Sequence, residues 1–81
     1  MSALFKFAAG DLVVWRHGLD GVTFAGVVLR ALDGAYNLAV THRWPGGRLR
    51  VARDWSVPAH DLEGCAHLTD MDTLEAAENA A

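Results

Sequence analysis

The sequence predicts an all-β fold in which five short strands close into a small barrel, followed by a short acidic, partly helical C-terminal tail. Three observations support this prediction. Apolar and β-branched residues alternate with other residues over segments of strand length. Turn sequences that contain glycine separate these segments at short intervals. The 81 residues include 52% hydrophobic and 21% charged residues, a composition typical of one folded domain and not of a disordered chain.

The first strand is predicted at residues 12–16. Alternation directs Val13 and Trp15 toward the core and leaves two apolar residues, Leu12 and Val14, on the opposite face. That second face is therefore expected to be partly covered, and coverage by another subunit is one explanation.

A loop at residues 17–21 leads into the longest strand candidate, residues 23–31. The loop contains two glycines and an aspartate, which tolerate the backbone conformations of turns. Gly26 lies in the interior of the strand. A glycine there weakens a flat strand, but it allows the backbone to bend sharply or to approach another strand closely, as a small barrel requires.

Two turns delimit the third strand. Asp33-Gly34 lies between two apolar runs and predicts a tight hairpin in which both central residues have positive φ. Trp44-Pro45-Gly46-Gly47 predicts a second reversal, because proline ends the strand and the glycines supply the turn. Residues 36–43 alternate between them, and the predicted core face carries Tyr36, Leu38, Val40 and His42.

The fourth strand is predicted at residues 48–53. Its side chains are expected to divide between two faces, with Leu49 and Val51 inward and Arg48 and Arg50 outward. The chain cannot continue regularly through Pro58, because proline lacks a backbone donor. We therefore expect one short helical turn and then a brief closing strand near Leu62 and Glu63.

The charge separates along the chain. The barrel is assigned to residues 5–64 and the tail to residues 65–81. Residues 1–60 carry a net charge of +3, whereas the residues from Asp61 onward carry −6. The acidic segment is interpreted either as a solvated terminal helix or as a tail that shields a basic face.

A helix is predicted within the tail. Residues 69–72 match the spacing of a capping box, and helix-forming residues follow. Met71 and Leu74 are its only large apolar residues. Because so short a helix is not stable by itself, it is expected either to dock on a partner or to fray.

The single cysteine, Cys65, excludes an internal disulfide and indicates a reducing compartment. The first ten residues lack the apolar length of a secretory signal or of a membrane span. We therefore expect a cytoplasmic protein that has no membrane partner.

Four side chains that can bind metal lie close together in the sequence: His60, Asp61, Cys65 and His67. Structural zinc sites favour paired Cys or His spacings, which this segment lacks, so no metal site is predicted. A thiol next to a histidine also suggests a nucleophile. A chain of this length leaves little scaffold for a substrate cleft and a third orienting group, so no catalytic residue is predicted.

Four short segments occur in an informative order: Phe7-Ala8-Ala9-Gly10-Asp11-Leu12-Val13, Phe24-Ala25-Gly26-Val27-Val28, Gly34-Ala35-Tyr36 and Val57-Pro58-Ala59-His60-Asp61-Leu62-Glu63. This order resembles that of SH3-like barrel proteins. Among these it is most similar to the plasmid-borne type II dihydrofolate reductases, over residues 7–63. The resemblance implies a five-stranded SH3-like barrel, and in those reductases four such barrels build one pore.

The functional part of this resemblance fails at one segment. In the reductases a Val-Gln-Ile-Tyr-Pro run before the closing turn contacts folate and nicotinamide. The run here is Asp54-Trp55-Ser56-Val57-Pro58, in which Trp, Ser and Val replace Gln, Ile and Tyr. The sequence therefore predicts no cofactor. An oligomeric pore enzyme distantly like this family remains the last of three functional hypotheses.

Arginines and tryptophans gather around the fourth predicted strand, and they define the predicted binding residues: Arg43, Trp44, Arg48, Arg50, Arg53 and Trp55. The first hypothesis is a non-enzymatic binding or assembly module that uses this face against a protein partner or another copy of itself, because aromatic residues and arginine are enriched at interfaces. The alternative is nucleic-acid binding, since these barrels also resemble Tudor and KOW domains and single-strand binders combine arginines with aromatic rings.

Overall fold

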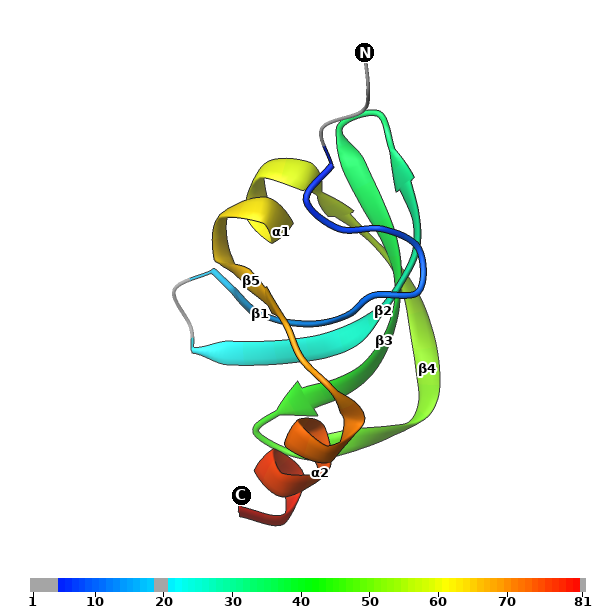
Figure 1. The fold of residues 1–81 in the computed structure, drawn as a ribbon. Helices are drawn as coiled ribbons and strands as arrows, with labels where there is room; N and C mark the ends of the chain where they lie inside the picture. The colour runs from blue at the N-terminus through cyan, green and yellow to red at the C-terminus, as the bar shows by residue number, and fades with distance from the viewer. Residues whose placement is uncertain (1–4, 19–20, 81) are drawn as a thin grey trace.

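The computed structural model describes residues 5–18 and 21–80, which form an antiparallel sheet and two helices (Figure 1). Residues 19 and 20 of the predicted loop lie outside this described part. The strands are β1 (Leu12–His17), β2 (Val22–Leu32), β3 (Ala35–Trp44), β4 (Gly47–Pro58) and β5 (Ala66–Leu68). The helices are α1 (Ala59–Cys65) and α2 (Met71–Ala80). Neither described helix is long and apolar enough to cross a membrane.

The sheet has five strands in the order β4-β3-β2-β1-β5 and is not closed into a barrel. β4 and β5 are its two edges, and no pairing joins them within the described residues. The predicted closure is therefore wrong. Residues 62 and 63, where a closing strand was expected, belong to α1, and β5 follows at Ala66–Leu68 and pairs with β1. The helix continues because the segment after Pro58 contains helix formers and directs one large apolar side chain, Leu62, into the core.

One face of the sheet, here called the inner face, packs against α1 and the N-terminal segment. Its buried cluster contains Phe7, Val13, Trp15, Val28, Tyr36, Leu38, Val40, Val57, Leu62 and Ala66. The predicted inward positions on β1 and the first three on β3 are thereby confirmed. The main core follows from simple alternation along these strands.

A register shift exchanges the faces near the end of β3. His42 lies opposite Ala25, whereas Val40 lies opposite Gly26, so Thr41 is an extra residue on β3. Neighbouring residues on β2 face opposite sides of the sheet, and His42 therefore leaves the inner face. Its burial is confirmed, with 2% of the residue exposed, but its predicted position beside Val40 is wrong.

Gly26 provides the close approach that the sequence predicts. A Cβ built on Gly26 would overlap the carbonyl oxygen of Ala39 and would lie 2.9 Å from the Cα of Val40. The glycine also stands at the register shift between β2 and β3. Only a residue without a side chain permits this backbone contact.

A second shift makes β4 bulge away from β3. Val40 pairs with Arg53 and His42 pairs with Arg48, which leaves four residues of β4, Leu49–Ala52, opposite Thr41 alone. Val51 is 76% exposed, so its predicted inward orientation is wrong. Leu49 is partly buried against the core, as predicted.

The two predicted turns are present. Leu32 pairs with Ala35 across Asp33-Gly34, but in this turn only Gly34 has a positive φ, of 82°. The second reversal contains a cis Trp44–Pro45 peptide bond, followed by two glycines with φ of 123° and 87°. These glycines are needed there because other residues rarely adopt such angles.

Helix α2 is docked on the sheet and not isolated (Figure 1). Leu74 is only 2% exposed, whereas Met71, the other large apolar residue, is 49% exposed. The amide of Thr73 donates a hydrogen bond of 2.7 Å to the carboxylate of Asp70, which caps the helix. The sequence predicted that this helix either docks on a partner or frays. In the structure it packs against strand β4 of its own chain.

Candidate binding groove

The six predicted binding residues do not form one surface. Arg43, Arg53 and Trp55 line an open groove of about 710 Å³, together with Phe24, Val40, Leu49 and Asp54; this is called the inner groove. Arg48 and Arg50 line a separate hollow of about 330 Å³ between β4 and α2, called the outer pocket. Trp44 stacks on His42, with ring centroids 5.5 Å apart and planes 21° from parallel.

Aromatic rings build the wall of the inner groove. Trp55 lies on β4 and pairs with the buried Leu38 of β3, so its side chain is on the inner face of the sheet. Its ring meets Phe24 edge to face, with centroids 4.8 Å apart, and lies 5.4 Å from the ring of His17. Trp15 lies beneath, 6.4 Å from Trp55. These contacts hold the indole in place, so a ligand that packs on it costs little conformational entropy.

Two arginines border this wall. Arg43 lies opposite Phe24 across β2 and β3, which puts it on the inner face, and Arg53 lies opposite Val40. Both residues are exposed. In the described part of the chain, no carboxylate lies within 4.0 Å of either guanidinium. Their donors are therefore available to an anionic group that lies along the rings.

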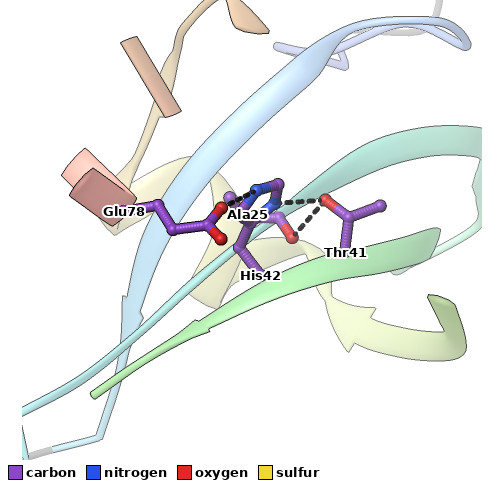
Figure 2. A network of polar contacts seen from close by, with 4 residues as sticks. All are labelled: Ala25, Thr41, His42 and Glu78. Carbon is purple, nitrogen blue, oxygen red and sulfur yellow. Dashed lines mark hydrogen bonds and ion pairs between the residues drawn. The ribbon is translucent and has the colours of Figure 1, made fainter. Parts of the chain in front are cut away.

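The outer pocket has mixed charge. Arg48 and Arg50 from β4 face the same hollow as Glu75 and Glu78 from α2. Figure 2 shows the contact that joins α2 to the sheet beside this pocket: Glu78 Oε2 lies 3.6 Å from Nε2 of the buried His42. The other ring nitrogen of His42 lies 2.7 Å from the hydroxyl of Thr41.

Sequence reasoning missed several residues of these sites. Phe24 and His17 belong to the inner aromatic wall, and neither stands near the arginine-rich segment in the sequence. The alternation of β1 and β2 could have aligned Phe24 with Trp15, since they are cross-strand neighbours. The role of Glu78 had no comparable indication, because it depends on how α2 docks.

The residues considered as metal ligands do not converge. His60 lies 3.2 Å from Asp61 at an exposed position. The thiol of Cys65 donates instead to backbone carbonyls, that of Asp61 at 2.7 Å and that of Arg16 at 3.2 Å. Within residues 5–18 and 21–80, no three His, Cys, Asp or Glu side chains gather as a set of ligands.

Comparisons with known proteins add no relative. No protein-family model, no curated protein and no solved structure matches the chain. The inner groove is therefore interpreted from its own chemistry.

Proposed function

We propose that this chain is a small, non-enzymatic binding and assembly module with an open, SH3-like arrangement of strands. It acts through the inner groove and strand β4, against a protein partner or a second copy of itself. The observation that carries this proposal is the combination of rigid rings with two cations that have no ion-pair partner among the described residues: Arg43 and Arg53 border the wall that contains Trp55 and Phe24. Aromatic residues and arginine are the side chains that dominate the energetics of protein interfaces.

The chemistry of the groove favours a protein segment that combines an apolar side chain with a carboxylate. The apolar side chain packs on Trp55 and Leu49, and the carboxylate accepts hydrogen bonds from an arginine. Apolar contact gives an interface that high salt does not dissociate, whereas an interface made by phosphates alone weakens steeply with salt.

Nucleic-acid binding is the second candidate, because two arginines and the half-buried indole of Trp55 line one groove. Single-strand binders use the same combination, with arginines on phosphates and rings on bases. Overall charge argues against it, since the chain carries −3 and dedicated binders are basic.

The test is the absolute mass of the full chain by light scattering during size exclusion, at low and high salt, with absorbance at 260 and 280 nm. We expect a salt-stable assembly free of nucleic acid. Trp55→Ala with Arg43→Ala weakens assembly or partner capture, whereas Arg30→Ala, on the exposed part of β2, leaves it unchanged. A monomer whose excess 260 nm absorbance disappears at high salt would overturn the assembly role in favour of nucleic acid.

A further inference from the structure

Strand β4 has an edge that pairs with no other strand in the described part of the chain, and the centre of this edge is apolar. It is an edge strand of 12 residues, and its segment Leu49–Ala52 bulges away from β3. Val51, at the middle of this segment, is 76% exposed, the highest fraction among the large apolar residues of the described chain. An exposed edge strand is a template on which another strand can pair through backbone hydrogen bonds.

The segment remains extended in spite of the bulge. Arg48, Arg50 and Ala52 line the outer pocket, Arg53 and Asp54 line the inner groove, and Leu49 lines both. All of these residues lie within the strand Gly47–Pro58, whose extended backbone can pair with a further strand.

A two-fold axis at Val51 would bring opposite charges of two copies of β4 together. If two copies of β4 pair in antiparallel orientation with Val51 opposite Val51, residue 48 of each copy lies opposite residue 54 of the other. Arg48 then faces Asp54 of the partner copy, twice in each dimer. Within the described residues neither of these side chains has an ion-pair partner in its own chain.

Neighbouring registers are less favourable. An axis between residues 50 and 51 sets Arg48 opposite Arg53, and an axis between residues 51 and 52 sets Arg50 opposite Arg53. Like charges directly opposite each other destabilise a strand pair. An axis at Ala52 leaves Val51 opposite an arginine, whereas the axis at Val51 puts the exposed valines in contact with each other.

We propose that two copies of this chain pair through β4 about a two-fold axis at Val51, with Arg48 of each copy facing Asp54 of the other. The inference rests on the proposed assembly role and specifies its partner and register. It also makes the binding site composite. Leu49 faces Arg53 of the partner copy, and both residues line inner grooves, so the two grooves meet at the interface.

A cysteine on the axis tests the register directly. In a Cys65→Ser background, Val51→Cys puts two thiols opposite each other, at a Cβ separation of about 4.5–5.5 Å that a disulfide can bridge with small adjustments. We expect mild oxidation to give a covalent dimer on a non-reducing gel. Leu29→Cys in the same background is the control, because Leu29 is also exposed but lies on β2.

A charge exchange tests the facing residues. Arg48→Asp and Asp54→Arg, each alone, create two like-charge contacts in the dimer and are expected to raise its dissociation constant by about tenfold or more. The double variant Arg48→Asp with Asp54→Arg restores the opposite charges and is expected to bring the dissociation constant back to near that of the unchanged chain. Light scattering over a concentration series measures all three.

The outcomes separate this inference from the proposed function. A chain that stays monomeric at every concentration overturns the β4 pairing and the self-association part of the proposed function, whereas binding of another protein in the inner groove is judged by partner capture. An assembly that neither crosslinks at position 51 nor shows rescue in the double variant overturns the β4 pairing, and assembly through the inner groove remains. Crosslinking at position 51 together with rescue of the dissociation constant establishes the pairing and its register.

Discussion

Glu78 on α2 lies 3.6 Å from the buried ring of His42 on β3, and its side chain passes over Gly47, where an added Cβ would lie 3.2 Å from the Glu78 Cγ. This contact joins the C-terminal helix to the sheet. Replacing Glu78 with Gln weakens it, because the neutral amide lacks the carboxylate charge that attracts the imidazole.

We expect Glu78→Gln to lower the free energy of unfolding by about 0.5–1 kcal/mol, a modest amount because the carboxylate is partly exposed. Amide hydrogen exchange in α2 should accelerate more than exchange in β2. Glu75→Gln is the matched control, since Glu75 is on the same helix and is not paired with His42. Equal effects of the two substitutions would show that the His42 contact does not anchor the helix.

Gly26 leads to a prediction about stability. Gly26→Ala puts a methyl group into the carbonyl of Ala39, and backbone atoms cannot move aside cheaply. We expect a loss of about 2–4 kcal/mol in urea unfolding, and a larger loss for Gly26→Val. Gly64→Ala is the control, because nothing lies within 4 Å of the added Cβ and alanine favours the helix. A Gly26→Ala variant as stable as the unchanged chain would contradict the close approach of β2 and β3.

Tyr36 connects three parts of the chain. Its hydroxyl donates to Glu63 of α1 at 2.9 Å and accepts a hydrogen bond from the amide of Phe7 at 3.3 Å. Tyr36→Phe leaves both partners unsatisfied in or near the core, and we expect a cost of about 1–2 kcal/mol in urea unfolding. No change in stability would mean that water replaces the hydroxyl.

The same residue predicts sensitivity to alkali. Burial raises the pKa of Tyr36 above its ordinary value of 10.0; the Phe7 amide opposes this effect and the Glu63 carboxylate adds to it. A group whose pKa is higher in the folded state stabilises the fold below its unfolded pKa. That contribution is present below pH 10 and is lost as the pH rises through the folded value. Tyr36→Phe should therefore flatten the dependence of stability on pH above 10.

Asp70 predicts an effect at low pH. Its hydrogen bond from the Thr73 amide holds the pKa of the carboxyl below its ordinary value of 3.8. A lowered pKa stabilises the folded form above pH 3.8 and ceases to do so as the pH falls through the folded value. Far-ultraviolet circular dichroism should show α2 weakening in that range. Asp70→Asn keeps a capping side chain without the charge and should remove this dependence on pH, whereas Asp70→Ala should weaken the helix at all pH values.

Local pattern was enough to predict much of the core. Alternation identified Val13, Trp15, Tyr36 and Leu38 as buried, and the two turns were predicted from short local sequences that contain glycine. These features depend on neighbours in the sequence. Closure of the barrel depends on where the chain goes after Pro58, and seven helical residues followed where one turn was expected.

The candidate site was predictable only in part, because two register shifts redistribute its residues. Periodicity does not show where one strand gains a residue relative to its neighbour. Thr41 therefore separates Val40 from His42, and the bulge in β4 turns Val51 outward. The arginine-rich segment was visible in the sequence, but the division of its side chains between the inner groove and the outer pocket follows from the pairing of the strands.

The extra residue at Thr41 also has an evolutionary consequence. Loss of its single codon would remove the shift and leave a regular ladder, with His42 still opposite Ala25 and Arg43 still opposite Phe24. The groove would keep its cation, because the partners on β2 already follow one another without a gap. Position 41 is thus a place where a lineage can lose a residue without exchanging the faces of β3, whereas loss of Arg43 would move Trp44 to the place opposite Phe24.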